Sequence, residues 1–281
     1  MQSSPARSGL VLPTRAQSKV AIFAFIALTF AWTWGLSFIA GQFKGDLLAL
    51  GNGLRILATF GPSLAAVAVV GVTQGSAGLR AWLVRCLDWR VGWRWYGLAF
   101  LTPPILIVAA IWLDVALGGV MPGFLAAEKI PLAITNFGLV LVLGGPLGEE
   151  FGWRGYLTPA LTARMNWRAA SLVVGVIWGV WHLPLFFTAG TPQAAMAMSV
   201  FILNILAGAV IFGWIFDRTR GSVVPALVLH TSLNAWAGIL AIIPTATVWR
   251  PFVLLTGLQL LVAVTLLFVP TRKPLPLVTA A

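Results

Sequence analysis

The sequence predicts an all-α fold, a polytopic bundle of about eight transmembrane helices with both termini in the cytoplasm. Three observations support this fold class. Hydrophobic residues make up 59% of the 281 residues and charged residues only 9%, whereas a soluble domain has about 25% charged residues. Apolar runs of about 20 residues, long enough to cross the hydrocarbon core of a bilayer, recur along the chain. Lys and Arg are also distributed unevenly between the connecting segments.

The first predicted span begins at Lys19, after a polar segment over residues 1-18 that we expect to lie in the cytoplasm. Its apolar run continues to about residue 40, which is too long for the core of a cleavable signal peptide. Gly144-Gly145-Pro146 is expected to break or kink the fourth span. We predict eight spans, at residues 19-40, 54-74, 95-118, 132-158, 168-188, 194-216, 222-243 and 251-270. Together they form a transmembrane bundle over residues 19-270, followed by a cytoplasmic tail over 271-281.

The positions of the 18 Lys and Arg residues determine the predicted orientation. With eight spans, four of them fall on one side, namely Lys44, Arg55, Lys129 and Arg250, and the other fourteen on the opposite side. Positive residues collect on the cytoplasmic side, so the richer side is predicted to face the cytoplasm, most simply across a bacterial plasma membrane. Lipid headgroups explain these charges, and no basic run is dense enough to indicate binding of nucleic acid.

The connector from Gly78 to Trp95 places four arginines among tryptophans and leucines. This pattern predicts an amphipathic segment in the cytoplasmic interface of the membrane. The single cysteine of the chain, Cys86, lies in this connector and excludes an internal disulfide. We interpret it as a small apolar filler.

Two adjacent carboxylates, Glu149 and Glu150, follow the apolar run of the fourth span, although the chain has only seven acidic residues. A charge inside a membrane costs about 2.5 to 3.5 kcal/mol on insertion scales, so such residues are candidates for function. Glu150 and Arg154 are one helical turn apart, which lets Arg154 neutralise Glu150, while Glu149 points about 100° away. This split indicates one carboxylate for structure and one for chemistry.

Both histidines of the chain, His182 and His230, fall inside predicted spans. The helical rise places them at about the depth of Glu149. His230 and Asn234 are four residues apart, so their side chains project from one face of a helix. A lone buried histidine is more often a packing residue than a catalyst, but two histidines with Asn234 in register and carboxylates nearby favour a catalytic site.

Three motifs now stand on successive spans: Glu149-Glu150-x-x-x-Arg154, an aromatic-x-x-x-His182, and His230-x-x-x-Asn234. In this order they resemble the motifs of the CAAX-protease and bacteriocin-processing family of intramembrane proteases, also called the ABI family. The resemblance covers about residues 132-240, and the basic, Trp-rich connector is similar as well. One departure is visible, because the aromatic is usually Phe and here is Trp178, which we expect to pack beside His182.

The resemblance implies an endopeptidase that faces the cytoplasm and cleaves a membrane-associated peptide or protein. It assigns activation of water to Glu149, help in holding that water to His182, and hydrogen bonds to the tetrahedral oxyanion to His230 and Asn234. Family members have also been described as metalloproteases, and Glu149, His182 and His230 would make a two-histidine, one-carboxylate zinc set. The chain lacks H-E-x-x-H, and Asn234 suits an oxyanion donor better than a metal ligand, so we favour a metal-free mechanism with zinc as the alternative.

Two other function classes remain open from the residues alone. One is a proton-coupled transporter in which the carboxylates and histidines form a proton relay. The other polar residues of the spans are few and no inverted repeat is visible, which argues against it. The second is a catalytically silent immunity or scaffold protein of the membrane, against which the intact set of Glu149, His182, His230 and Asn234 argues.

Overall fold

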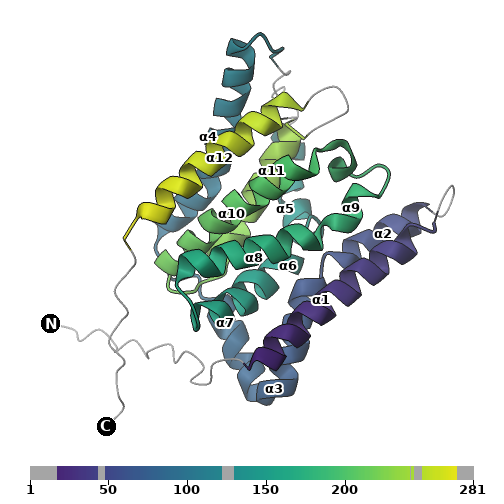
Figure 1. The fold of residues 1–281 in the computed structure, drawn as a ribbon, viewed down its shortest axis with the longest axis vertical. Coiled ribbons are helices and arrows are strands. Elements are labelled where there is room, and N and C mark those ends of the chain that lie inside the picture. Colours follow the sequence, from purple (N-terminus) through teal and green to yellow (C-terminus); the bar gives the residue numbers. More distant parts are fainter. Residues whose placement is uncertain (1–17, 44–47, 122–129, 241, 244–248, 271–281) are drawn as a thin grey trace.

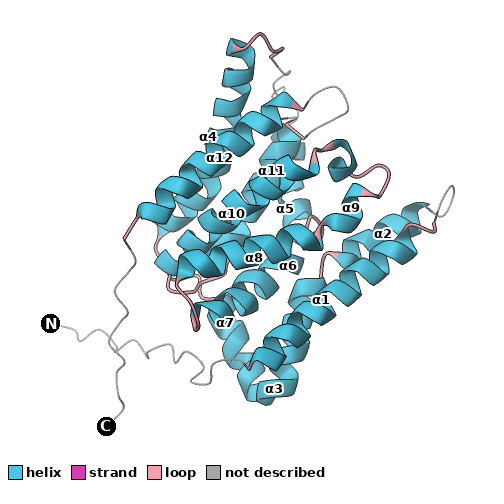
Figure 2. Ribbon diagram, viewed as in Figure 1, coloured by secondary structure: helices cyan, strands magenta, loops and turns pink. Residues whose placement is uncertain are grey.

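The structure, a computed structural model, describes residues 18-43, 48-121, 130-240, 242-243 and 249-270. Within these ranges the chain folds into helices joined by turns and contains no β-strand (Figure 2). The predicted all-α fold class is therefore confirmed. The predicted cytoplasmic tail lies outside the described residues, as does the predicted N-terminal segment apart from Ser18, whose hydroxyl caps the first helix by accepting from the Ala21 amide at 3.0 Å.

The helices begin and end at the following residues: α1 (Lys19–Ala40), α2 (Leu48–Ala58), α3 (Gly61–Cys86), α4 (Trp93–Ala116), α5 (Ile130–Leu143), α6 (Pro146–Gly152), the π-helical turn η3 (Trp153–Leu157), α7 (Thr158–Thr162), α8 (Trp167–Trp181), α9 (Leu183–Phe186), the 3-10 turn η4 (Pro192–Ala195), α10 (Met198–Arg218), α11 (Val224–Ile239) and α12 (Arg250–Phe268).

The helices pack in two rows. Helices α12, α10, α8 and α1 contact one another in that order and lie side by side in Figure 1, while α4, α11, α6 and α3 form the second row. Helix α5 packs against α11 and α6. The short helix α6, which carries both glutamates, therefore lies between the long helices α11 and α3.

Five helices in the described part of the chain, α1, α3, α4, α10 and α12, are long and apolar enough to cross a membrane. Each of them overlaps a predicted span, and α8 and part of α5 are shorter apolar helices. The break predicted near Gly144-Gly145-Pro146 is present, because α5 ends at Leu143 and α6 begins at Pro146. The protein is thus an integral membrane protein by the length and composition of its helices.

Two predicted spans had wrong bounds. The span predicted at 54-74 is divided between α2, which ends at Ala58, and α3, which has Pro62 in its first turn and continues to Cys86. Gly75, with φ +67°, kinks α3 on the way. The span predicted at 168-188 ends at Trp181, because Pro184 has no amide hydrogen with which to continue the helix.

Two glycines bring α6 into close contact with the first turn of α3 and the residues just before it. A Cβ on Gly152 would lie 2.4 Å from the carbonyl of Pro62, and one on Gly148 would lie 2.6 Å from the carbonyl of Thr59. Small residues spaced one turn apart let helix backbones approach in this way in membranes. Helix α6 therefore turns its glycines to α3 and leaves its glutamates for other neighbours.

The predicted amphipathic connector begins as the last turns of α3. Trp82 and Cys86 are buried, whereas Trp89 and Trp93 are exposed, and the location in the membrane interface stays a prediction. Arg85 differs from the prediction that lipid headgroups explain the basic residues, because it is buried. It donates, together with the Trp82 indole, to the carbonyl oxygen of Gly155. The interpretation of Cys86 as a filler agrees with its full burial.

Two arginines bind the C-terminal end of α12. Arg168, at the start of α8, donates to the carbonyls of Leu267 and Val269, each at 2.6 Å. Arg218, at the end of α10, donates to the carbonyl of Pro270 at 2.5 Å. The ends of three helices are thereby joined at one end of the bundle, through two residues that the charge asymmetry assigns to the same side.

Candidate active site

A glycine and a proline set the start of the helix that carries the glutamates. Gly145 has φ +103°, a backbone conformation that residues other than glycine rarely adopt. Pro146 occupies the first position of α6. A Cβ on Gly145 would also lie 2.5 Å from Oε1 of Glu149. Residue 145 must therefore be glycine both for the turn and to leave room for the carboxylate of Glu149.

The helix widens into a π-helical turn directly after the glutamates. Within it the Thr158 hydroxyl donates to the Trp153 carbonyl at 2.8 Å, and the Gly155 carbonyl accepts from the Trp82 indole at 3.0 Å as well as from Arg85. The Trp153 carbonyl thus accepts from both the backbone amide and the hydroxyl of Thr158, and the Gly155 carbonyl accepts from two side chains of α3. Wide turns of this kind occur frequently at functional sites.

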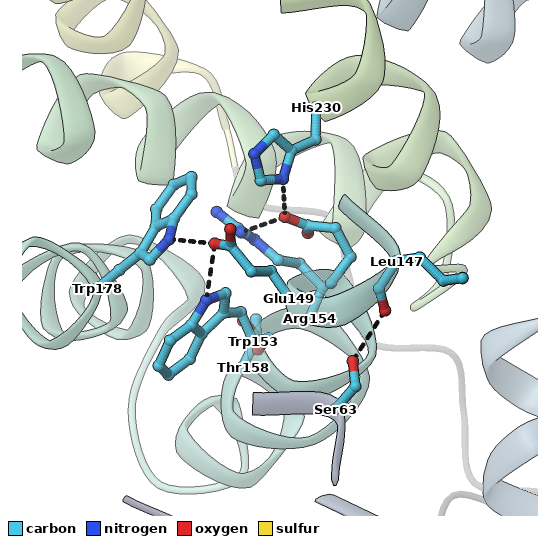
Figure 3. A network of polar contacts seen from close by, with 9 residues as sticks. Ser63, Leu147, Glu149, Trp153, Arg154, Thr158, Trp178 and His230 are labelled. Atoms are coloured by element: carbon cyan, nitrogen blue, oxygen red, sulfur yellow. Dashed lines mark hydrogen bonds and ion pairs between the residues drawn. The ribbon is translucent and has the colours of Figure 1, made fainter. Parts of the chain in front are cut away.

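Glu150 is fully buried, and one of its oxygens has two nitrogen partners. Its Oε1 accepts from Nη1 of Arg154 at 2.8 Å and from Nδ1 of His230 at 2.8 Å (Figure 3). The pairing with Arg154 confirms the prediction made from their spacing, and the contact with His230 was not predicted. The Arg154 guanidinium lies over two aromatic rings, 4.5 Å from the Trp178 centroid and 4.0 Å from that of Phe212.

Glu149 points to a different set of neighbours, as predicted. Its Oε2 accepts from the indole Nε1 of Trp178 at 2.6 Å and from that of Trp153 at 3.3 Å. Figure 3 shows both indole nitrogens directed at this one oxygen. Only 4% of Glu149 is exposed, so the two indoles replace water at this oxygen.

His182 lies at the C-terminal end of α8 with its Nδ1 atom 2.8 Å from the carbonyl oxygen of Trp178. A carbonyl can only accept, so Nδ1 carries the hydrogen, and in the neutral ring Nε2 has a free lone pair. The ring packs edge-on against Trp181 and Phe201, with centroids 4.7 Å and 5.1 Å away. His182 can therefore accept a hydrogen bond through Nε2.

Asn234 and His230 reach the same segment from one face of α11, as their spacing predicts. His230 contacts Glu150, and the amide nitrogen of Asn234 donates to the carbonyl of Gly144 at 3.2 Å. Asn234 is half-buried, whereas His230 is buried. An amide nitrogen has two hydrogens, so Asn234 retains one N–H for a further acceptor.

The candidate zinc ligands are arranged for hydrogen bonding to the protein. Among the described residues, no group of three or more His, Cys, Asp and Glu side chains is placed to hold a metal ion. Glu149 accepts from two indoles, His182 faces a carbonyl, and His230 faces Glu150. These hydrogen bonds occupy Oε2 of Glu149 and Nδ1 of each histidine, and the zinc alternative stays a prediction.

Comparison with known proteins agrees with the motifs. Residues 131–236 match the model of a family described as type II CAAX prenyl endopeptidase Rce1-like. This part of the chain is similar to that family. The matched segment contains all the residues predicted for the site, and the predicted resemblance to CAAX proteases is confirmed.

A curated relative is similar over a longer stretch of the chain. CAAX prenyl protease 2 of Methanococcus maripaludis is 32% identical over 151 residues, which is 51% of this chain and 55% of that protein. The chain thus spans about half the length of the curated relative that it matches.

Two residues of the site were missed in the sequence, the indole donors Trp153 and Trp178. Trp153 was not considered, and Trp178 was expected only to pack beside His182. It does so, with ring centroids 5.9 Å apart, but its indole also binds Glu149. A signal existed for Trp153, because it follows Glu149 by one helical turn.

Proposed function

We propose that this protein is an intramembrane endopeptidase that hydrolyses a peptide bond in a membrane-associated substrate, with Glu149 as the base that activates water. One observation carries the proposal: Glu149 is buried, and both of its hydrogen bonds to the described residues end on one oxygen, Oε2. The other oxygen, Oε1, is then available for a water molecule. The Rce1-like match and the protease name of the 32% identical relative support the same activity.

In the proposed reaction Glu149 removes a proton from water while the water oxygen attacks the carbonyl carbon of the scissile bond. His182 assists by accepting a second hydrogen bond of that water through Nε2. The tetrahedral intermediate then collapses, and the proton held by Glu149 passes to the leaving amine. Glu149 thereby returns to its ionised form and two peptides are released.

His230 and Asn234 are proposed to stabilise the oxyanion of the intermediate. His230 can donate through Nε2 when both ring nitrogens carry hydrogen, and Glu150 at 2.8 Å from Nδ1 offsets the resulting charge. Asn234 supplies its second amide hydrogen. Donors fixed before reaction and aimed at a developing charge contribute about a hundredfold to a thousandfold each.

The substrate is proposed to reach the site from the cytoplasmic side of a bacterial plasma membrane. The uneven distribution of Lys and Arg supports this side, as does the clustering of Arg168 and Arg218 at one end of the bundle. The relative is named a CAAX prenyl protease, so a prenylated C-terminal peptide is the first substrate class to test.

The test is cleavage of peptides by protein reconstituted in liposomes. Three substrates are compared: a prenylated peptide ending in a CAAX sequence, the same peptide without the prenyl group, and a transmembrane peptide with a cytoplasmic extension. We expect wild-type protein to cleave at least one of them and Glu149→Gln to be at least about a hundredfold slower, with the same melting temperature. Equal rates for wild type and Glu149→Gln would remove Glu149 from the mechanism.

A further inference from the structure

We infer that Trp178 is the positioning residue of this site, which orients both the proposed base and the histidine that holds the water. The inference rests on the proposed function. Trp178 is 3% exposed and lies on α8, the helix that ends at His182. Through different atoms it contacts Glu149, His182, Arg154 and His230.

Two of these contacts fix the geometry of the reacting groups. The indole Nε1 donates to Oε2 of Glu149 at 2.6 Å, and the backbone carbonyl of Trp178 accepts from Nδ1 of His182 at 2.8 Å. The first contact prevents the carboxylate from rotating, and the second selects the histidine tautomer with a free lone pair on Nε2. Because one residue makes both contacts, the distance between base and histidine depends on the position of Trp178.

The indole has the right chemistry for this role. It has one donor and no acceptor, so it can donate to an ionised carboxylate and cannot accept the proton that Glu149 later takes from water. Hydrogen bonds to a charged acceptor are shorter and stronger than neutral ones, and burial strengthens them further. The 2.6 Å contact of Trp178 is shorter than the 3.3 Å contact of Trp153, so Trp178 is the principal donor to Glu149.

The ring of Trp178 is itself held by its neighbours. The Arg154 guanidinium lies 4.5 Å from its centroid, and Phe212 and His230 pack against it at 5.8 Å and 5.7 Å. Arg154 in turn binds Glu150. The indole is therefore fixed before substrate binds, as a positioning residue requires.

The experiment removes the donor and keeps the ring. Trp178→Phe deletes the indole N–H, and incorporation of benzothienylalanine at position 178 replaces it with sulfur while preserving the fused ring. Trp167→Phe is the matched control, since Trp167 lies on the same helix, is 6% exposed and has no hydrogen-bond partner for its Nε1 among the described residues. All variants are full-length protein in lipid nanodiscs, assayed with the peptide that wild type cleaves.

We expect both changes at position 178 to lower kcat by about tenfold to a hundredfold, the range for loss of a hydrogen bond to a charged group, with KM changed by less than about threefold. Trp167→Phe should leave kcat within about threefold of wild type. A purely structural role would lower melting temperature and activity together, and benzothienylalanine would then restore activity. Equal kcat for the benzothienylalanine protein and wild type would overturn the inference.

A second measurement follows the hydrogen bond itself. The method is NMR of protein whose tryptophans carry the heavy nitrogen isotope. The indole N–H resonance of Trp178 is expected to shift when Glu149→Gln removes the charge, whereas that of Trp167 should not move. An unchanged Trp178 resonance would also overturn the inference. This readout needs no substrate, so absence of cleavage by wild type would refute the proposed function alone, while cleavage that is insensitive to position 178 would refute this inference alone.

Discussion

Nδ1 of His230 lies 2.8 Å from Oε1 of Glu150, the same oxygen that Arg154 contacts. Glu150 thus joins a residue of α11 to one in the π-helical turn, and it has no exposed surface. Its second oxygen and Nη2 of Arg154 are buried without a hydrogen-bond partner among the described residues. Buried polar atoms of this kind commonly bind an ordered water, which would complete the network around Glu150.

Glu150→Gln is expected to destabilise the protein as well as inactivate it. The change leaves Arg154 as a buried charge without its partner, which costs about 3 to 5 kcal/mol, and it weakens the hold on His230. Thermal unfolding in detergent and the rate of peptide cleavage should both fall. Glu149→Gln is the matched control, because the side chain of Glu149 accepts only from indoles among the described residues, and removing its charge should leave the melting temperature unchanged. A stable, inactive Glu150→Gln beside an active Glu149→Gln would reverse the two roles.

Gly152→Ala is expected to lower stability by about 1 to 3 kcal/mol or more, because the added methyl group would meet the backbone of Pro62 at 2.4 Å. Gly71→Ala is the control on a neighbouring helix, where a Cβ meets nothing within 4 Å. There the change should be neutral or stabilising by up to about 1 kcal/mol. The shift in the midpoint of thermal unfolding measures both, and equal shifts would contradict the close packing of α6 on α3.

The charge asymmetry predicts that the chain end and the connector between α3 and α4 lie on the cytoplasmic side. Lys273 is outside the described residues. A reporter protein that is active only in the cytoplasm should be active when it is fused after Lys273. A cysteine placed by Arg90→Cys, an exposed position, should resist a membrane-impermeant thiol reagent in intact cells and react after permeabilisation. The native Cys86 is buried and should not contribute. Extracellular labelling at position 90 would overturn the eight-span arrangement.

Zinc is expected to be dispensable. The candidate ligands Glu149, His182 and His230 do not form a metal-binding group in the described residues, so purified active protein should contain far less than one zinc per chain and should tolerate a chelator. Elemental analysis and cleavage assays with and without chelator decide this. One zinc per chain, with activity lost to chelator and restored by zinc, would establish the alternative mechanism.

The break before α6 was predictable from sequence, and the break before α3 was not. In Gly144-Gly145-Pro146, the two glycines readily adopt non-helical conformations and the proline favours the first position of a new helix. The break therefore depends on these three residues alone. A proline without such glycines is ambiguous. Pro62 lies in the first turn of α3, whereas Pro103 and Pro104 lie inside α4, which continues through them. Whether a proline starts or merely bends a helix depends on the neighbours that satisfy the freed carbonyls.

In the site, contacts within one helix were predictable and contacts between helices were not. Glu150 and Arg154 pair because residues four apart on a helix are neighbours whatever surrounds them. The bonds of Glu150 to His230 and of Glu149 to Trp178 join residues 80 and 29 positions apart. They depend on how each helix is rotated about its axis. Helices with apolar residues on all sides give little indication of that rotation, because lipid and core suit the same side chains.

The π-helical turn changes the phase of the helix that contains it. One extra residue in a turn rotates everything that follows by about 100° about the axis, relative to an uninterrupted α-helix. Glu149 and Glu150 lie before this rotation, where they face α8 and α11, and α7 lies after it, where it packs on α8. Deleting one residue from 153-157 would leave the composition and the apolar length of the segment almost unchanged, yet it would rotate the two glutamates relative to α7, so that both could no longer meet their present neighbours.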